Sequence, residues 1–238
     1  METQRESDAR QISIVLPVRN QADHIARIVE EYIAVLTKAP VAVAVILVVN
    51  ACRDNSLDVC RALAERYPII QVIESISGGW GLAVRQGIGA AHGDLICYTN
   101  SARTSPQDLV LLVLYAVANP GVVIKANRKI RESLWRRLGS LLYNLECRML
   151  FDLPYWDVNG TPKVFPRAFD RLCKLERNDD LIDLEFNVMC QRAGYAMLEV
   201  PIFSTRRHGG KSTTKLGSAL KLYSGAYQLK RALMRASR

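Results

Sequence analysis

The sequence lacks any uninterrupted apolar run of the length that a membrane-spanning helix needs. Its longest runs, Val41–Val49 and Leu109–Ala118, are far shorter than the roughly 18–20 residues that cross a bilayer. Residues 1–11 are mostly polar or charged and contain no apolar stretch of the kind found in a secretion signal. We therefore predict a cytoplasmic protein, and leave open a peripheral position on the inner face of the membrane.

Paired cysteines are also lacking. The six cysteines are scattered along the chain and none forms a Cys-x-x-Cys pair, which excludes the usual zinc pattern and, in a cytoplasmic protein, a disulfide framework. Apolar residues make up 49% of the chain and charged residues 23%, as in globular rather than disordered proteins. A length of 238 residues fits one α/β domain.

Acidic residues are absent from the last part of the chain. Residues 204–238 contain nine Lys or Arg and no Asp or Glu, so this segment holds the whole net charge of +9. Such an asymmetry indicates an anionic partner, namely phosphate groups, a lipid surface or a nucleic acid. The aromatic residues of the segment are Tyr223 and Tyr227, too few for the stacking platforms that bind single-stranded nucleic acid. We therefore predict no nucleic-acid partner.

What is present in the first half is an alternation of apolar strands and amphipathic helices. Four nearly continuous apolar runs predict strands, and each is followed by a helical pattern: 12–18, 41–50, 69–75 and 94–100. Buried strands that alternate with helices predict an α/β fold with a mostly parallel sheet covered on both faces. Ligands of such sheets bind beyond the carboxyl ends of the strands, here after Val18, Asn50, Ser75 and Tyr98.

After Asn119 the pattern changes. A further strand, "VVIKANR", precedes a long helix with six apolar residues on one face: Leu134, Leu138, Leu141, Leu142, Leu145 and Met149. "DVNGTPKVFPRAF" reads as strand or loop, "LIDLEFNVMCQRAG" as a helix, and "YAMLEVPIF" as a last strand. The predicted domains are a tail at 1–11, one α/β domain at 12–212 and a basic amphipathic helix at 213–238, which we expect to contact a membrane surface.

Five short motifs occur in a particular order: "ISIVLPVRNQADHI", "VVNACRDNSLD", "GGWGLAVRQGIGAAHGDLI", "DVNGTPKVF" with "GYAMLEVPI", and "RRHGGKS". Together they resemble family 2 glycosyltransferases of the GT-A fold, and within that family the polyprenyl-phosphate branch that includes dolichol-phosphate mannose synthase. The resemblance implies inverting transfer of a sugar from a nucleotide-sugar donor to a lipid-linked acceptor, for example a polyprenyl phosphate. The alternative is a GT-A-like domain that binds a nucleotide sugar or an anionic lipid without transfer.

The resemblance also implies which residues form the site. Contacts with the nucleotide-sugar donor are expected from the following residues: Pro17, Arg19, Asn20, Asn50, Asp54, Gly79, Arg85, Asp94, Asn100, Ser101 and Arg103. Catalytic roles are expected for cations facing phosphates and for carboxylates near the acceptor: Arg128, Arg206, Lys211, Asp157 and Asp183. Fixed cations suit a diphosphate leaving group, because its negative charge grows in the transition state.

Several of these segments have simpler interpretations. Gly79-x-Gly81 superficially matches a dinucleotide-binding turn, but Val84 stands where the third glycine belongs. On spacing alone, the loop after Asn50 could be turn chemistry with a helix cap. The segment from Arg206 to Lys211 could be a solvated basic turn. Asp183 or Glu185 could serve as a general base, but both could instead lie on an exposed helix face.

The sequence departs from the family where a metal ion is expected. Asn100, Ser101 and Ala102 stand in place of its Asp-x-Asp motif, and divalent cations are normally held by carboxylates. We predict no protein metal ligands. Mg²⁺ or Mn²⁺ could bind weakly with the donor diphosphate, cations such as Arg103 could replace it, or the domain could be inactive. A homo-oligomer is left open.

Overall fold

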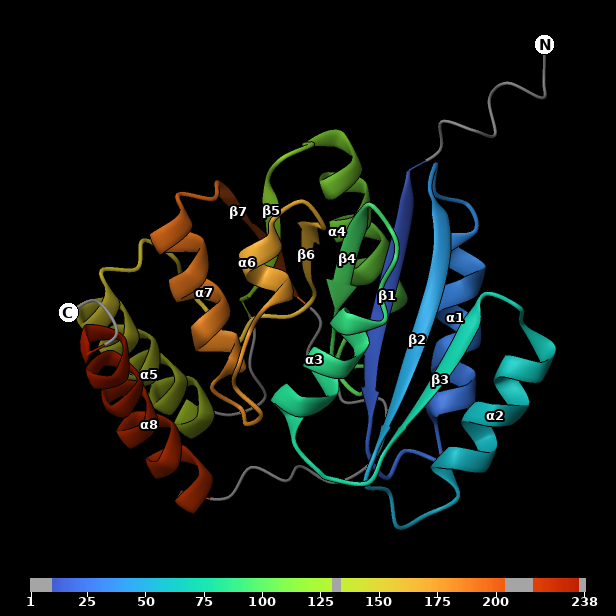
Figure 1. Cartoon of the computed structure of the whole chain (residues 1–238), viewed down its shortest axis with the longest axis horizontal. Helices are drawn as coiled ribbons and strands as arrows, with labels where there is room; N and C mark the ends of the chain where they lie inside the picture. The colour runs from blue at the N-terminus through green and yellow to red at the C-terminus, as the bar shows by residue number, and fades with distance from the viewer. Residues whose placement is uncertain (1–9, 130–133, 204–215, 236–238) are drawn as a thin grey trace.

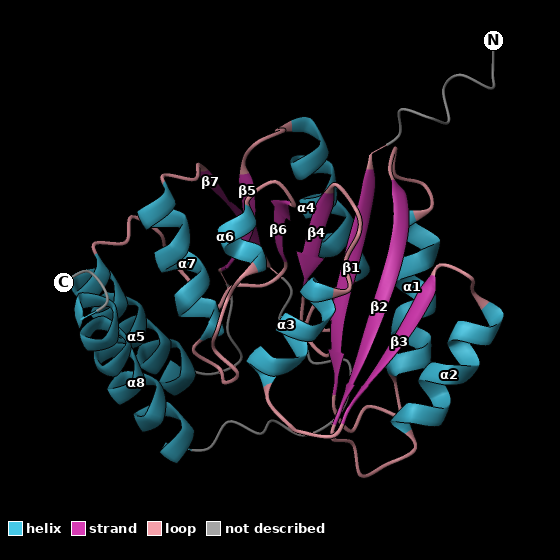
Figure 2. Cartoon of the chain, in the orientation of Figure 1, coloured by secondary structure: helices cyan, strands magenta, loops and turns pink. Residues whose placement is uncertain are grey.

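The computed structural model describes residues 10–129, 134–203 and 216–235, apart from the side chains of residues 134–137 and 216–221. One central sheet runs through the molecule, and helices cover both of its faces (Figure 1). Helices α5 and α8 lie together beside α7, at the end of the molecule away from β1 and β2 (Figure 2). The predicted α/β architecture is therefore confirmed.

Seven strands form the sheet: β1 (Gln11–Val18), β2 (Ala42–Asn50), β3 (Ile70–Ser75), β4 (Leu95–Tyr98), β5 (Val123–Arg128), β6 (Lys163–Pro166) and β7 (Met197–Ile202). Their order across the sheet is β3-β2-β1-β4-β6-β5-β7. Strand β6 runs antiparallel to both neighbours and the other pairs are parallel. The segment "DVNGTPKVFPRAF", which the sequence left open as strand or loop, thus contains strand β6. The sheet is mostly parallel.

The described residues form eight helices, of which α8 follows the last strand: α1 (Ile25–Leu36), α2 (Ser56–Arg66), α3 (Trp80–Gly89), α4 (Pro106–Ala118), α5 (Leu134–Phe151), α6 (Asp170–Cys173), α7 (Ile182–Ala193) and α8 (Leu216–Arg235). Local chemistry sets some of their ends. The Ser105 hydroxyl accepts a hydrogen bond from the Asp108 backbone N–H and caps α4, whose first residue is Pro106. Helix α7 ends at Gly194 with a left-handed φ of +67°.

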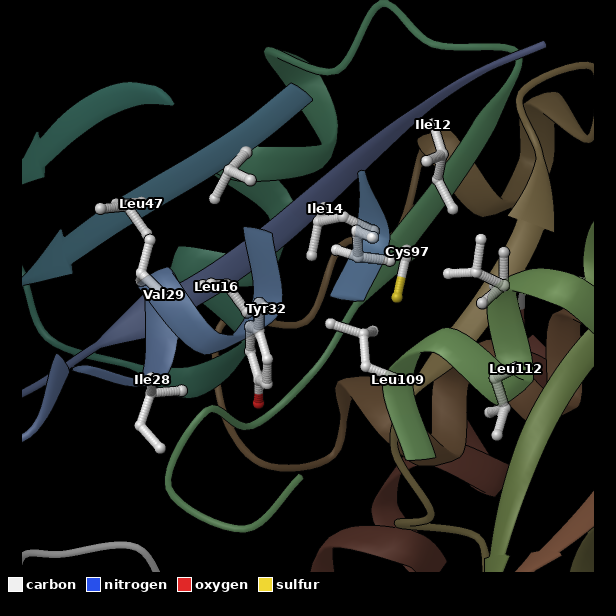
Figure 3. Packing of buried hydrophobic residues seen from close by; sticks show 14 of the residues in the cluster. Ile12, Ile14, Leu16, Ile28, Val29, Tyr32, Leu47, Cys97, Leu109 and Leu112 are labelled. Atoms are coloured by element: carbon white, nitrogen blue, oxygen red, sulfur yellow. The ribbon is translucent and has the colours of Figure 1, made fainter. Parts of the chain in front are cut away.

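The two faces of the sheet have separate apolar cores. On one face, α1 and α4 pack against β1, β2 and β4; Ile14, Leu16, Val29 and Leu109 meet there (Figure 3). On the other face, α3, α6 and α7 pack around residues such as Phe165 and Phe186. Because β1, most of β2 and β4 are buried on both faces, their sequences are nearly continuous apolar runs.

A third apolar cluster joins α5, α7 and α8. Tyr143 and Tyr223 stack edge to face with their ring centroids 5.6 Å apart, and Leu229 is buried beside them. The predicted amphipathic helix α8 therefore exists, but part of its apolar side packs against its own domain. Among the described residues, no helix is long and apolar enough to cross a membrane.

The apolar face predicted for α5 is on the outside of the molecule. Its described members are between 47% and 77% exposed: Leu138, Leu141, Leu142, Leu145 and Met149. The opposite side of the helix, which carries Tyr143, Cys147 and Phe151, faces the third cluster. Helical periodicity located the stripe correctly, but the core packs against the other side.

Candidate active site at the carboxyl edge of the sheet

The loops after β1 and β2 are bound to each other. The Arg53 N–H donates to Asn20 Oδ1 over 2.8 Å, and the Ala22 N–H donates to Asp54 Oδ2 over 3.1 Å. Asp54 also accepts the Ser56 hydroxyl. Burial opposes ionisation of Asp54, but these hydrogen bonds outweigh it and lower its pKa. The carboxylate therefore acts as a fixed brace between the two loops.

Asn50, the last residue of β2, is bound to the glycine loop after β3. Its Nδ2 donates to the Gly79 carbonyl and its Oδ1 accepts from the Gly79 N–H, both over 3.0 Å. Asn50 is only 3% exposed, so its side chain holds the loop and offers no open surface to a ligand. Arg19 extends along the same loop, 3.4 Å from the place where Gly78 would carry a Cβ.

Backbone strain gathers at this edge. Asn20, Ala51 and Asp157 all have left-handed φ values, between +46° and +51°, a conformation that residues other than glycine rarely adopt. Each lies in a loop beyond the carboxyl end of β1 or β2 or beside the end of β5. Strain of this kind persists where surrounding contacts enforce it, and it often marks functional sites.

The loop after β4 is held from within. The Asn100 Oδ1 accepts from the Ala102 N–H over 3.1 Å, and its carbonyl accepts from the backbone N–H of Arg103. The Ser101 hydroxyl donates to Gln21 over 2.7 Å and is fully buried. The side chains of Asn100 and Arg103 stay partly exposed.

These residues do not fit a tightly bound divalent cation. Asn100 offers a neutral oxygen that already accepts a hydrogen bond, Ser101 is closed in, and Ala102 has no donor atom. Within the described part of the chain, no group of three or more His, Cys, Asp or Glu side chains could hold a metal.

On the other side of the edge, Arg128 and Asp157 form a bidentate pair. The Arg128 Nε and Nη2 donate to the two carboxylate oxygens, each over 2.7 Å, and its backbone N–H adds a third bond over 2.9 Å. Burial opposes the charge of Arg128, but Asp157 outweighs it and raises the guanidinium pKa. Arg128 therefore remains a fixed cation at the end of β5.

Asp183, at the start of α7, receives three donors. The Tyr98 hydroxyl reaches it over 2.9 Å, the Trp80 Nε1 over 3.1 Å, and Lys163 Nζ forms an ion pair with it. Lys163 is fully buried, and burial lowers its pKa to about 8 against the pull of Asp183. The structure thus links β4, β6, α3 and α7 through one buried carboxylate.

The loop of residues 176–181 lies on the first turn of α3. A Cβ on Gly81 would lie 2.4 Å from the Arg177 carbonyl, so glycine is required for this close approach. Asp180 in the same loop reaches water, although surrounding protein raises its pKa, first by desolvation and then through Asp183 and Asp179.

A family comparison agrees with this geometry. Residues 13–171, more than half of the chain, match the family model described as glycosyl transferase family 2. The chain belongs to glycosyl transferase family 2. Curated relatives of this family member include undecaprenyl-phosphate 4-deoxy-4-formamido-L-arabinose transferases. The one from Pseudomonas syringae is 29% identical over 139 residues, which are 56% of this chain and 41% of the relative. The one from Pseudomonas fluorescens is 27% identical over 202 residues, which are 83% of this chain and 59% of the relative. The chain thus spans only part of these relatives.

Solved structures show the same GT-A-like fold. Glucosyl-3-phosphoglycerate synthase from Mycobacterium tuberculosis, in complex with Mn²⁺, UDP-glucose and phosphoglyceric acid, has a TM-score of 0.72 and 19% sequence identity; the match covers 95% of this chain and 81% of that one. Mannosyl-3-phosphoglycerate synthase from Rubrobacter xylanophilus has a TM-score of 0.71 and 21% sequence identity. The match covers 99% of this chain and 77% of that one. At these identities, the likeness concerns the fold alone.

The residues expected to bind donor in this family 2 member fall into three groups. Arg19, Asn20, Gly79, Asn100 and Arg103 lie at the carboxyl edge with at least part of their surface exposed, whereas Pro17, Asn50, Ser101 and Asp54 shape the loops. Two others lie elsewhere. Asp94 precedes β4, at the opposite edge, and accepts from the Gln11 N–H. Arg85 donates to the Glu176 carbonyl beside a cavity of about 430 Å³ on the outer side of α3.

Arg206 and Lys211 lie outside the described residues. For Asp183 and its neighbour Glu185, the alternative of an exposed helix face is wrong, because both carboxylates are buried and compensated. Glu185 accepts hydrogen bonds from the backbone N–H groups of Glu176 and Arg177.

Sequence reasoning missed Lys125 and Lys163, which are fully buried. Each of these lysines stands within an apolar strand sequence, and this position could have predicted a buried ion pair, since lysine is almost never buried without a partner.

Proposed function

We propose that this chain is an inverting glycosyltransferase that moves a sugar from a nucleotide-diphosphate donor to a lipid-linked phosphate of the polyprenyl-phosphate class. The observation that supports a phosphate acceptor is the engagement of both carboxylates expected near it. Asp157 accepts from Arg128 on both oxygens, and Asp183 accepts on both oxygens within a buried cluster. A hydroxyl acceptor needs a general base, whereas a phosphate is already anionic.

The donor is proposed to lie across the loops after β1 to β4. Arg19, Asn20, Gly79 and Asn100 would contact it, while Asn50, Asp54 and Ser101 keep these loops in shape. The relatives named as undecaprenyl-phosphate transferases support the acceptor class. The structural neighbour with UDP-glucose supports a nucleotide sugar as donor.

The reaction is proposed to be a single displacement. One acceptor phosphate oxygen bonds to the anomeric carbon while the bond from that carbon to the donor diphosphate breaks. The electron pair leaves with the nucleoside diphosphate, and the configuration inverts. Arg103 and Arg128, together with Arg206 and Lys211 after β7, would stabilise the leaving charge.

A second candidate is transfer to a hydroxyl group, and Asp180 is the observation that favours it. Its carboxylate reaches water at the first turn of α3, and its raised pKa suits a general base better than an ordinary aspartate does. In this reaction Asp180 would take the hydroxyl proton during attack on the anomeric carbon.

The test compares two acceptors that differ only in the phosphate. Donor is first chosen by thermal stabilisation with UDP, GDP, CDP and dTDP sugars, since binding to the native state raises its stability. Release of nucleoside diphosphate is then measured with a short-chain polyprenyl phosphate and with the matching polyprenol. We expect turnover with the phosphate alone, and little effect of Asp180→Asn. Turnover on polyprenol that Asp180→Asn abolishes would establish the hydroxyl reaction instead. Donor binding without any turnover would support a non-catalytic domain.

A further inference from the structure

The most exposed residues of α5 form an apolar stripe. Between residues 138 and 151, the exposed residues are Leu138, Leu141, Leu142, Leu145 and Met149, while Ser140, Glu146 and Arg148 are partly exposed. Their spacing of three and four residues places them in one stripe along the helix. Single exposed apolar residues are ordinary, but a contiguous stripe of this kind marks an interaction surface.

The stripe is separate from the side of α5 that packs on the apolar core. The opposite side of α5 is already packed, through Tyr143, Cys147 and Phe151, against the cluster shared with α7 and α8. The Tyr223 hydroxyl of α8 also donates to the Gly139 carbonyl over 2.7 Å. Helix α5 therefore has two apolar sides, and the structure leaves one of them uncovered by the described residues.

The neighbouring helix α8 is basic, whereas α5 itself carries the partly exposed Glu146 and is followed by the exposed Asp152. Helix α8 lies beside α5 (Figure 2), and its described side chains include Lys230, Arg231 and Arg235 but no acidic residue. Near the end of α5, the Arg148 guanidinium lies 4.1 Å from the centre of the half-exposed Trp156 ring. Tryptophan and basic residues beside an apolar stripe are typical of helices that lie in the interface of a membrane.

We propose that the α5 stripe docks onto an anionic lipid bilayer, with the helix parallel to the surface and its leucines at the level where headgroups meet acyl chains. An 18-residue helix is about 27 Å long, and it would lie along the membrane instead of crossing it. The inference deepens the proposed function, on which its purpose rests, because a lipid-linked acceptor is presented at that surface. It also replaces the expectation that α8 alone makes the contact.

The first experiment measures sedimentation of the full chain with vesicles of equal parts phosphatidylglycerol and phosphatidylcholine, without donor or acceptor. Leu141→Gln with Leu145→Gln should lower vesicle affinity by about tenfold or more, because the apolar face drives insertion. The matched control is Leu111→Gln with Leu114→Gln on α4, where the leucines are comparably exposed. It should bind vesicles like the unchanged protein. Equal binding by all three proteins would overturn the proposal.

A second arm identifies the occupant. Arg231→Gln with Arg235→Gln should weaken vesicle binding at low salt and matter less at high salt, since surface charges are screened. Sedimentation equilibrium without lipid tests a second copy of the chain. A dimer that the α5 variant disperses, with no vesicle binding by the unchanged protein, would overturn the lipid proposal.

A third arm separates this inference from the proposed function. Turnover of a water-dispersed short-chain acceptor, measured without vesicles, should be unchanged in the α5 variant. Vesicle binding that depends on the stripe, without turnover of any acceptor, would retain the docking surface and reject the proposed reaction.

Discussion

The two halves of the molecule differ in where their ion pairs lie. In the first half, the ion pairs Arg27–Glu31, Arg61–Glu74 and Arg66–Glu30 lie on the surface, with side chains 39% to 68% exposed. The second half has the surface pairs Lys174–Asp170 and Arg177–Asp179, but it also has three pairs that are largely buried: Lys125–Glu199, Lys163–Asp183 and Arg128–Asp157. Surface pairs add little stability, whereas a buried charge is costly unless its partner stays in place.

The two halves also differ in exposed apolar surface. The first half leaves Ile76, Leu111, Leu114 and Tyr115 exposed, whereas the second half exposes the longer stripe on α5. Under the proposed function, the first half serves chiefly as a frame for the loops after β1 to β4. The buried charge network and the exposed stripe of the second half would then serve the acceptor.

Breaking the buried pair of Lys163 and Asp183 should have the largest effect. We expect Lys163→Met to lower the free energy of unfolding by about 3–5 kcal/mol, because Asp183 is left buried without its cation. The double variant Lys163→Met with Asp183→Leu should lose less than Lys163→Met alone. Urea denaturation measures both.

The matched control is Arg61→Met, which removes one member of the exposed pair with Glu74. It should change stability by less than about 1 kcal/mol. If Arg61→Met and Lys163→Met cost the same, the difference between the two halves is not energetic.

The packing of α8 on the domain gives the next prediction. Leu229→Ala should lower the free energy of unfolding by about 2–5 kcal/mol, because it opens a cavity among α5, α7 and α8. Met234→Ala, on the exposed side of the same helix, should cost about 0.5 kcal/mol or less. Thermal or urea unfolding distinguishes them. An equal, small effect of both would mean that α8 does not pack on the domain in solution.

How much the sequence predicts depends on how many environments a pattern allows. Apolar runs such as Val45–Val49 are buried on both sides. A continuous apolar run of this length fits a parallel strand with helices on both faces, so the α/β fold was predictable. Strand β6 has only four residues and includes Lys163. Its sequence is too short to show a strand periodicity, and it gives no indication that the strand runs antiparallel to its neighbours. The stripe on α5 was located, but periodicity does not say which side the core covers.

The site was only partly predictable for a related reason. Motifs place residues at the carboxyl edge, but they do not say which side chains face a ligand and which hold the loops. Asn50, Ser101 and Asp54 turned out to brace neighbouring segments, through contacts that join parts of the chain about 30 to 80 residues apart. The partners of Asp183, from β4, β6 and α3, come together only through the sheet topology.

Charge at the donor edge gives a smaller expected effect. If Arg103 stabilises the leaving diphosphate in place of a metal, Arg103→Ala should cost roughly 1.5–3 kcal/mol of transition-state stabilisation, about tenfold or more in turnover. Excess EDTA should cost less than that. Arg27→Ala, in an exposed pair on α1, is the control and should leave turnover unchanged. Calorimetry that shows micromolar Mn²⁺ binding to the unchanged protein would contradict this assignment.

The pH dependence of stability changes gradually, with the smallest effect per pH unit, and tests the same buried charge. Burial lowers the pKa of Lys163 to about 8, from 10.5 when it is exposed in the unfolded chain. Between these values the unfolded chain keeps a proton that the folded protein has released. The group therefore destabilises the fold below about pH 8, and that cost is relieved as pH rises.

Relative to the double variant Lys163→Met with Asp183→Leu, the unchanged protein should gain stability from about pH 8 to about pH 10, by at most about 1.4 kcal/mol per pH unit. The exposed Lys174 should behave in the opposite way. Its hydrogen bond and ion pair with Asp170 raise its pKa, so its contribution is lost as pH rises through that value. Urea unfolding from about pH 8 to about pH 10 measures the sign for Lys163, and the same measurement extended above pH 10.5, with Lys174→Met in parallel, measures the sign for Lys174. A flat difference for Lys163 would show that it keeps its proton and that the buried pair stays fully ionised.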